Sequence, residues 1–374
     1  MDVTGIEVYG RTKDYDWDPV ETSSSFERLT LFSKQDSATV PKKVLSDSVD
    51  DALSSLQPDA VAIHGWSISS ALAATYWCAR NSIPSVLMSE STAHDAKRTW
   101  WREAIKRRIV SLHSAALVGG SAHTRYLQEL GMSPSCIMQG YDVIENSHFH
   151  EGAKLAQRRE LEMRADLDLP EKFFLASARF IAKKNLTGLI DAYAEYHRNA
   201  GSEAWHLVIL GDGPLREAIL QRQKDHNLRD YIHLPGFKQY NELPAYYGLA
   251  NAFVHASTTE QWGLVVNEAM AAGLPVLVSN RCGCTPDLVS HDKNGYIFDP
   301  SKISDIAKSM SRIASPTSDL TKMGKASQAI IDEWSPAAFG EGLEAAVRTA
   351  RSRSTHQQAV SVLDRAILAF LMLR

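Results

Sequence analysis

The sequence predicts an α/β protein with two Rossmann-like, doubly wound domains. Short apolar segments alternate with longer amphipathic segments between residues 60 and 130, and the same alternation restarts at residue 173. A polar, charged stretch at 151–168 separates the two series. Strands that alternate with helices are typical of a parallel sheet covered by helices. The length of 374 residues suits two domains of ordinary size, expected at 1–155 and 156–350.

The elements of the first domain follow from this alternation. At the start, residues 6–9 and 29–32 could form strands, and polar residues separate them. Apolar runs then predict strands at 60–64, 85–89 and 116–118. Helical periodicity predicts helices at 69–81, 95–112 and 122–130.

The elements of the second domain continue the pattern. Strands are predicted at 173–178, 206–210, 232–235, 252–255 and 276–279. Helices are predicted between them at 186–198, 214–226, 242–250 and 264–272. Further helices at 301–313, 320–333 and 337–349 close the domain, and an amphipathic helix at 357–373 ends the chain.

The composition excludes several classes of protein. A hydrophobic content of 44% gives ample core material, and a net charge of −4 argues against nucleic-acid binding. The four cysteines are too few and scattered for a disulfide framework, and their spacing suits zinc poorly: Cys78, Cys136, Cys282 and Cys284. No apolar stretch is long enough to span a bilayer, and the N-terminus is no signal peptide. We therefore expect a cytoplasmic protein.

Two glutamates, Glu260 and Glu268, stand around the start of one apolar helix at 264–272. Gly263 permits a tight entry into this helix, and Gly273 ends it. A helix N-terminus attracts phosphate through its free N–H groups and its dipole. Carboxylates beside it are better placed to accept hydrogen bonds from hydroxyl groups. Hydroxyl, diphosphate, hydroxyl is the layout of a nucleotide sugar.

The segment resembles the E-x7-E signature of retaining glycosyltransferases with the two-domain GT-B fold, in particular family 4. Four further stretches resemble the same family, at 178–180 with 183–185, 210–214, 279–289 and 294–295. The resemblance implies two domains that face a cleft, with the C-terminal helix in 351–374 crossing back to the first domain. It is strong in the second half of the chain and looser in the first.

The start of the chain departs from the family. Family members usually begin with a strand and a glycine-rich loop that lines the acceptor site, and Gly5 and Gly10 do not stand in such surroundings. The first domain could therefore lack its first strand. This departure bears on acceptor binding and on activity.

The resemblance assigns catalytic roles to Arg179 and Lys184, which would clamp the donor diphosphate. Both follow the first strand of the second domain, where the loops of an open sheet form a ligand crevice. Two cations there would neutralise the charge that grows on the leaving group. The alternative is a pair of solvated surface charges, and the adjacent Lys183 suits that alternative better.

The same resemblance assigns roles around the glutamate motif. Glu268 would bind the ribose hydroxyls and Glu260 the hydroxyls of the transferred sugar; the alternative is two ordinary exposed glutamates. The N–H groups near Gly263, Leu264 and Val265 would complete the phosphate site. Trp262 stands where the family usually has a phenylalanine, so core packing and contact with the sugar both remain open.

Five further residues are donor-site or cleft candidates. Gly211 and Gly213 form a Gly-x-Gly turn beside the donor pocket or a purely structural turn. Phe237 lies where the family often reads the base. His94 follows a first-domain strand near the place where family members have a catalytic histidine, although a structural role is equally open, and Glu90 could instead orient the acceptor.

Two charged runs allow more than one interpretation. The run Lys97–Arg108 is basic and aromatic, so it could lie on an anionic membrane, or form a solvated helix with Trp100 or Trp101 in the core. Asp14, Asp16 and Asp18 superficially resemble a metal-binding motif, but Pro19 breaks the run and a polar loop is the better interpretation. We expect no metal and no cofactor besides the nucleotide sugar.

The sequence therefore predicts a retaining glycosyltransferase that moves a sugar from a nucleotide-diphosphate sugar to an acceptor hydroxyl. The acceptor would be a glycan or a lipid-linked glycan, as in polysaccharide biosynthesis. One alternative is a catalytically impaired nucleotide-sugar-binding protein, and another is a GT-B sugar-nucleotide epimerase. A dehydrogenase is disfavoured because neither half carries a Gly-x-Gly-x-x-Gly fingerprint with its downstream acid.

Overall fold

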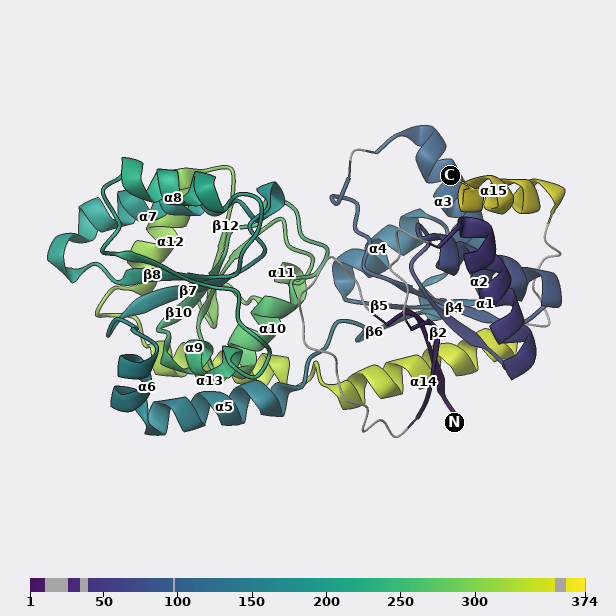
Figure 1. The fold of residues 1–374 in the computed structure, drawn as a ribbon, viewed down its shortest axis with the longest axis horizontal. Coiled ribbons are helices and arrows are strands. Elements are labelled where there is room, and N and C mark those ends of the chain that lie inside the picture. The colour runs from purple at the N-terminus through teal and green to yellow at the C-terminus, as the bar shows by residue number, and fades with distance from the viewer. Residues whose placement is uncertain (11–25, 34–39, 97, 354–360, 374) are drawn as a thin grey trace.

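The computed structural model describes residues 1–10, 26–33, 40–96, 98–353 and 361–373. It shows two α/β units that lie side by side, each built around a parallel sheet (Figure 1). One unit contains a six-stranded sheet from the second half of the chain, and the other contains a four-stranded sheet from the first half. The predicted fold class, two doubly wound domains, is confirmed.

The six-stranded sheet has the order β12-β11-β10-β7-β8-β9, and all its pairings are parallel. Its strands are β7 Phe173–Ser177, β8 His206–Leu210, β9 Ile232–Gly236, β10 Ala252–His255, β11 Val276–Ser279 and β12 Gly295–Phe298. The chain starts in the middle with β7, runs outward to β9, and returns to the other side with β10. The direction of the strand order therefore reverses between β7 and β10, which is the usual ligand position in such sheets.

Helices cover both faces of this sheet (Figure 1). One face packs against α7 Leu186–Ala200, α8 Arg216–Asp225 and α12 Ile303–Ile313. The other face packs against α5 Asn146–Arg158, α9 Leu243–Leu249, α10 Leu264–Ala271 and α13 Leu320–Ile331. Successive residues of a strand point to opposite faces, so Phe174 joins one core and Leu175 the other. Strands buried on both faces read as continuous apolar runs, which explains why the sequence revealed them.

The four-stranded sheet has the order β3-β4-β5-β6. Its strands are β3 Val61–His64, β4 Ser85–Ser89, β5 Ala115–Val118 and β6 Ile137–Gln139, and its helices are α1 Lys42–Leu56, α2 Ser69–Asn81, α3 Trp100–Ser111 and α4 Ser121–Glu129. The chain also opens with a strand, β1 Thr4–Tyr9, which pairs in parallel with β2 Glu27–Phe32. The loop that follows β1 falls outside the described residues, as do Asp14, Asp16 and Asp18.

The predicted polar stretch 151–168 is helical and lies in α5 and in α6 Glu160–Asp166. Helix α5 packs against α9 and α10 beside the second sheet. At the other end, α14 Pro336–Arg353 packs against β4, β5 and β6, and α15 Val362–Leu373 packs against α2. Both C-terminal helices thus return to the first sheet, while the domain limits at residues 155 and 350 stay a prediction.

Two differences from the predicted elements have clear physical reasons. The helix expected from residue 95 begins only at Trp100, because Arg98 binds the carbonyl oxygens of Thr92 and Ala93 and holds the preceding segment as a loop. Helix α1, which we did not predict, is held by tertiary packing of its buried Leu45, Val49 and Leu53. Strand β12 and the short helix α11 Thr285–Leu288 were also not predicted.

Two expectations from composition can be compared with the described part of the chain. All four cysteines are free and buried, as expected for a chain without a disulfide framework. Among the described residues, no helix combines the length and the apolar character needed to cross a bilayer.

Candidate functional site

The candidate site lies at the carboxyl ends of β7 and β10, where the strand order of the second sheet reverses. The loop after β7 contains residues 178–185, and the loop after β10 contains residues 256–263. The two loops are joined directly: the Thr258 N–H donates to the Lys183 carbonyl oxygen at 2.9 Å. Asn185 adds a second link, because its side-chain amide donates to the Ala256 carbonyl oxygen at 3.2 Å. The predicted site residues Arg179, Lys184 and Glu260 therefore come from neighbouring loops.

Glu260 is the most heavily engaged acid of this site. Its residue is only 9% exposed, which excludes the alternative of an ordinary exposed loop glutamate. The Lys184 ammonium binds Oε2, and the Lys183 ammonium lies 3.4 Å from Oε1. The Ser257 hydroxyl donates to Oε2 at 3.3 Å. Both carboxylate oxygens therefore have partners within the protein.

Ionisation of Glu260 depends on these partners. Burial by itself would raise the pKa of this carboxyl, but His255 and Lys184 outweigh it and hold the pKa well below its usual range. The His255 Nε2 atom lies 3.5 Å from Oε2, and burial lowers the pKa of that imidazole. Glu260 is thus an ionised acid at neutral pH in a nearly closed environment. Lys184 is equally enclosed, with 13% of its side chain exposed.

Sequence reasoning missed His255 and Ser257. His255 is the last residue of β10 and is 3% exposed, and its Nε2 lies 3.1 Å from the Ser257 hydroxyl. A signal was present, because polar residues directly after a buried parallel strand fall at the carboxyl edge of the sheet. The two residues contact Oε2 of the Glu260 carboxylate, the same oxygen that Lys184 binds.

The turn at 211–213 supports the loop that carries Arg179. A Cβ atom on Gly211 would clash with the Ala178 carbonyl oxygen, and Gly211 also has φ +120°. Gly213 has φ +149°, and a Cβ there would lie 2.9 Å from the Phe180 nitrogen. The Phe180 N–H donates to the carbonyl oxygen of Asp212 at 2.8 Å. The two glycines are required because the backbones of the two loops touch, so the turn positions partly buried Arg179.

Phe237 lies beside the same turn. It follows Gly236, whose carbonyl oxygen accepts a hydrogen bond from the Gly211 N–H at 2.9 Å. The Phe237 side chain is 38% exposed, so an apolar surface is available at the outer end of this loop cluster. Its predicted role beside the base stays a prediction.

Glu268 lies in the second turn of α10 and is partly buried. The Tyr247 hydroxyl donates to its Oε2 at 2.7 Å. Burial raises the pKa of Glu268 to about 7, although the Tyr247 hydrogen bond acts in the opposite direction. The alternative of an ordinary exposed helix glutamate is therefore wrong, and Tyr247 is a site residue that the sequence did not reveal.

Helix α10 begins as the sequence predicted. Gly263 precedes it with φ +111° and ψ +64°, a conformation that glycine adopts without strain. Leu264 is 40% exposed and Val265 is partly buried, so the first turn of the helix reaches the surface of the site. The N–H groups of a first helical turn have no partner within the helix and point outward. This end of α10 can accept an anion.

Trp262 packs between the two units. Of the two interpretations that the sequence left open, core packing and contact with the sugar, the structure favours core packing. It is 2% exposed, and its indole N–H donates to the Asn267 side chain at 2.9 Å. The Asn267 amide in turn donates to the Asp142 carbonyl oxygen at 3.0 Å, across the boundary between the units. The ring lies so near Gly119 that a Cβ there would be 3.0 Å from it.

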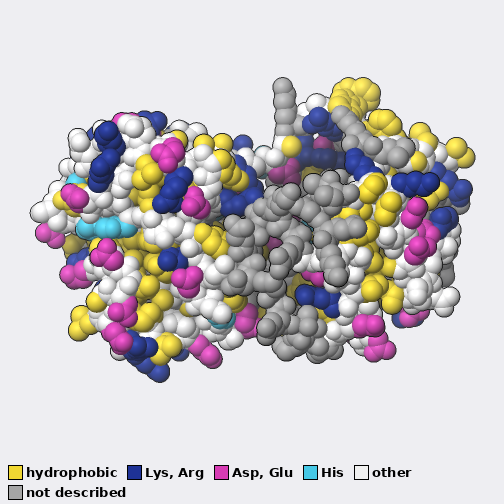
Figure 2. Space-filling model, viewed as in Figure 1, with side chains coloured by type: hydrophobic (Ala, Val, Ile, Leu, Met, Phe, Trp, Pro, Cys, Tyr) yellow, Lys and Arg dark blue, Asp and Glu magenta, His cyan; other side chains and the backbone are white. Residues whose placement is uncertain are grey.

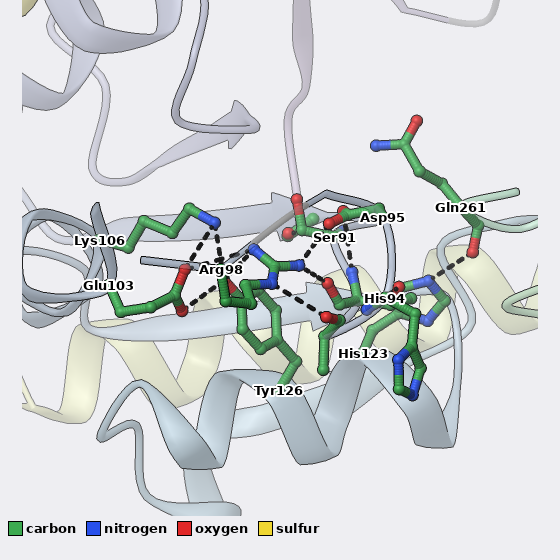
Figure 3. A network of polar contacts seen from close by, with 12 residues as sticks. Ser91, His94, Asp95, Arg98, Glu103, Lys106, His123, Tyr126 and Gln261 are labelled. Carbon is green, nitrogen blue, oxygen red and sulfur yellow. Dashed lines mark hydrogen bonds and ion pairs between the residues drawn. The ribbon is translucent and has the colours of Figure 1, made fainter. Parts of the chain in front are cut away.

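Helix α4 of the first unit also contacts the loop after β10 and the short helix α11. The Asp287 carboxylate accepts hydrogen bonds from the Ser121 N–H at 3.0 Å and from its hydroxyl at 3.2 Å, at the first turn of α4. His123 accepts from the Gly120 N–H at Nδ1, so its Nε2 carries the proton and donates to the Gln261 carbonyl oxygen at 3.0 Å. Figure 3 shows this contact between His123 and Gln261.

His94 is exposed on the surface, whereas His123 is buried. His94 lies in the loop after β4, its side chain is exposed, and its backbone N–H donates to the Thr92 hydroxyl at 3.2 Å. The histidine that contacts the loop after β10 is His123. Burial lowers the pKa of His123. The catalytic role predicted for His94 stays a prediction.

The carboxyl edge of the first sheet carries its own polar cluster. His64 ends β3, Glu90 follows β4, and Tyr141 and Asp142 follow β6. The Tyr141 hydroxyl is hydrogen-bonded to His64 Nδ1. Burial and the nearby Glu90 raise the pKa of Asp142 to about 9, so Asp142 is protonated at neutral pH. This edge thus gathers hydroxyl, imidazole and carboxyl groups.

The fold and the site together define a class: a GT-B protein, with two Rossmann-like units and its polar loops at the carboxyl edges of their sheets. The comparisons with known proteins agree. Residues 157–329 match the family model "Glycosyl transferases group 1". The predicted resemblance is confirmed at this level, while family 4 stays a prediction.

Curated relatives match part of the chain. A GDP-mannose-dependent alpha-(1-6)-phosphatidylinositol monomannoside mannosyltransferase of Mycobacterium tuberculosis is 29% identical over 164 residues, which are 42% of this chain and 41% of the relative. An alpha-monoglucosyldiacylglycerol synthase of Acholeplasma laidlawii is 34% identical over 122 residues, which are 32% of this chain and 30% of the relative. The matches thus span less than half the length of these relatives.

Solved structures match over most of the chain. Sucrose-phosphate synthase from Thermosynechococcus elongatus has a TM-score of 0.72 and 18% identity, and the match covers 93% of this chain and 89% of the other. Anabaena HepE in complex with UDP has a TM-score of 0.66 and 16% identity, with 87% and 86% covered. At these identities the likeness shows the fold.

The pairing of Lys184 with Glu260 predicts a measurable stability effect. Replacing Lys184 by Met leaves the Glu260 carboxylate buried without its closest cation, so the free energy of unfolding should fall by about 2–3 kcal/mol. The double variant Lys184→Met with Glu260→Gln removes the charge as well and should lose less. Thermal unfolding of the three proteins tests this; an equal or larger loss in the double variant would contradict it.

The contact at Gly211 predicts a second effect. Gly211→Ala should displace the loop that carries Arg179, because the new Cβ atom would clash with the Ala178 carbonyl oxygen. We expect nucleotide diphosphate binding to weaken by about tenfold, which corresponds to about 1.4 kcal/mol. Gly340→Ala is a matched control, because a Cβ there meets nothing within 4 Å. Isothermal titration with UDP and GDP measures both variants, and equal affinities would show that the turn does not position the site.

Proposed function

We propose that this protein is a retaining glycosyltransferase that moves a sugar from a nucleotide-diphosphate sugar to an acceptor hydroxyl. The observation that carries the proposal is the arrangement around α10. One ionised acid and one acid with a raised pKa flank a glycine-led helix N-terminus, and the loop after β7 brings cations to it at the point where the strand order reverses. The match of residues 157–329 to the family model "Glycosyl transferases group 1" supports the same conclusion.

The donor would lie across this arrangement. The first N–H groups of α10 face the diphosphate, and Arg179 and Lys184 supply positive charge from the loop after β7. Glu268 accepts hydrogen bonds from the ribose hydroxyls in exchange for part of its contact with Tyr247. The apolar ring of Phe237 borders the base.

Lys184 and Glu260 would exchange partners when the donor binds. In the structure they neutralise each other, so neither is left as a buried unpaired charge. An arriving diphosphate offers Lys184 a doubly charged partner, and Glu260 then turns to the sugar hydroxyls while His255 and Ser257 retain it. The ion pair thus holds the Lys184 ammonium and the Glu260 carboxylate close to the positions in which they would bind the donor.

Catalysis would rest on positioning and on charge stabilisation at the leaving diphosphate. The acceptor oxygen attacks the anomeric carbon on the face from which the diphosphate leaves, and a donor phosphate oxygen takes its proton. Arg179, Lys184 and the α10 N–H groups receive the negative charge that grows on the leaving group. This set of cations supports the expectation that transfer needs no metal ion.

The acceptor would bind at the carboxyl edge of the first sheet. His64 ends β3 at this edge, and Glu90 and His94 lie in the loop after β4. The names of two similar proteins refer to lipids: one is a phosphatidylinositol monomannoside mannosyltransferase, and the other is an alpha-monoglucosyldiacylglycerol synthase. We propose a glycan or lipid-linked glycan acceptor for this chain.

The central test is loss of turnover in two single variants. Arg179→Ala and Glu268→Ala should each lower turnover by at least about 100-fold, because each removes a contact to the donor that the transfer requires. Arg198→Ala, at the exposed end of α7, is a matched control that should retain activity. Release of nucleotide diphosphate measures transfer, and turnover near that of the unchanged protein in either variant would refute the assignment.

The same assay separates the alternatives. A catalytically impaired binding protein binds nucleotide sugar and releases no nucleotide diphosphate with any acceptor. A sugar-nucleotide epimerase changes the donor sugar without an acceptor. Acceptor-dependent release is the result that the glycosyltransferase proposal requires.

The raised pKa of Glu268 predicts a pH dependence of nucleotide binding. The group is protonated below about pH 7 in the free protein, and a carboxylate accepts hydroxyl hydrogen bonds more strongly than the protonated acid. The affinity for UDP or GDP should therefore rise as pH increases through 7, by about tenfold between pH 6 and pH 8.

The control for this dependence is Glu268→Gln, which cannot ionise. Titration calorimetry at both pH values should show a much flatter profile for this variant, because the remaining change comes from the nucleotide and from other groups. Identical profiles for the two proteins would show that the protonation of Glu268 does not govern binding.

A further inference from the structure

Helices α3 and α15 come from distant parts of the chain and lie next to each other on the first unit (Figure 1). The Arg108 guanidinium of α3 donates to the Asp364 carboxylate of α15 at 2.8 Å. The same guanidinium donates to the Ser361 hydroxyl at 3.2 Å. The two helices therefore form one surface, which we name the α3–α15 face.

Helix α15 is apolar on two opposite sides. Its inner side packs on the protein, where Leu368 is completely buried and Met372 partly buried. Its outer side exposes 85% of Val362, 54% of Leu363 and 65% of Phe370. A helix that is apolar all round is normally covered on all sides. The outer side of α15 is therefore typical of a surface that binds an apolar partner.

Helix α3 adds exposed aromatic residues to this face. Trp100 is 84% exposed and Trp101 is 41% exposed, so Trp100 does not pack in the core, one of the two interpretations that the sequence left open. Figure 2 shows hydrophobic side chains gathered over α3 and α15 at the upper right of the molecule. Tryptophan is enriched where a protein meets the boundary of a membrane.

The exposed charges of the α3–α15 face are all positive. In the described parts of these helices, Arg102, Arg107 and Arg365 are exposed, whereas both acids are paired. Glu103 accepts hydrogen bonds from Tyr126 and Lys106, and Asp364 accepts from Arg108. Arg98 and Lys106 contact Tyr126 and Glu103 on the protein itself, as Figure 3 shows. The face therefore presents apolar groups together with cations.

We propose that the α3–α15 face binds an anionic phospholipid surface. Exposed tryptophan and aliphatic side chains enter the boundary between headgroups and acyl chains, and arginines meet the lipid phosphates. A second copy of the chain fits less well, because a two-fold contact would bring the same arginine-rich surface against itself. Only the part of the run Lys97–Arg108 that points outward would take part, and α15, which the sequence did not suggest, completes the surface.

The bound surface would lie next to the acceptor edge. Helix α3 directly follows the loop of His94, and Arg98 connects the two parts. Its guanidinium binds the Thr92 carbonyl oxygen and the Asp95 carboxylate, and donates to the Tyr126 hydroxyl at 2.7 Å. Docking α3 on a membrane would thereby fix this loop beside lipid headgroups. If the proposed function holds, the acceptor hydroxyl belongs to a lipid headgroup or to a glycan attached to a lipid.

The test is sedimentation of the full chain with two kinds of vesicle, phosphatidylcholine alone and phosphatidylcholine mixed with phosphatidylglycerol. The protein should bind the anionic vesicles at least about tenfold more strongly. Trp100→Ser and Phe370→Ser should each lower this binding several-fold. Leu161→Ser is the matched control, because Leu161 is 88% exposed on α6 of the other unit and should not matter.

Several results would overturn the proposal: no vesicle binding, equal binding of both vesicle types, or unchanged binding in the Trp100 and Phe370 variants. A concentration-dependent dimer that Trp100→Ser disrupts would assign the face to a second copy instead. Thermal unfolding confirms that each variant is folded. UDP and GDP titration of the same variants separates the two proposals, since nucleotide affinity should stay unchanged whether or not the membrane binds.

Discussion

The buried carboxylate of Glu260 is the interaction on which the rest of the site depends. A charge removed from water is tolerated only when partners replace the lost hydration. Lys184, Lys183, His255 and Ser257 supply them. The lysines follow β7 and the other two belong to β10 and its loop, so this one ionised acid draws together the strands between which the sheet order reverses.

The same constraint extends to the first unit. The residues directly after Glu260 are held from the other side: the Gln261 carbonyl oxygen accepts from His123, and Trp262 packs near Gly119. Asp287 adds hydrogen bonds to the first turn of α4. The loop after β10 is therefore bound to the first unit, which gives the protein a direct physical connection between its two candidate binding edges.

The two glutamates of the motif are in opposite electrostatic states. Cations and a histidine keep Glu260 ionised, whereas burial raises the pKa of Glu268 to about 7. Environments that push the pKa values of two acids apart usually mark different tasks. This difference agrees with the proposed division of roles, in which Glu260 contacts the transferred sugar and Glu268 the ribose hydroxyls.

The sequence by itself determined the elements and the motif. The helix 69–81 and the strands 85–89, 206–210, 252–255 and 276–279 have the predicted limits, because buried strands and amphipathic helices leave local apolar patterns. The sequence also predicted the helix that carries Glu268 and the glycine that precedes it, Gly263. The positions of Arg179, Lys184, Gly211 and Gly213 in loops at one sheet edge followed from the alternation.

Only the tertiary structure decided which of these groups meet. Lys184 and Glu260 are 76 residues apart, and their pairing requires β10 to lie beside β7. His255, Tyr247, the buried Trp262 and the exposed Trp100 also depend on such neighbours, as does the loop that Arg98 holds before α3. Sequence periodicity records which side of an element is buried, but it does not record which element covers that side, because packing joins residues far apart in the chain.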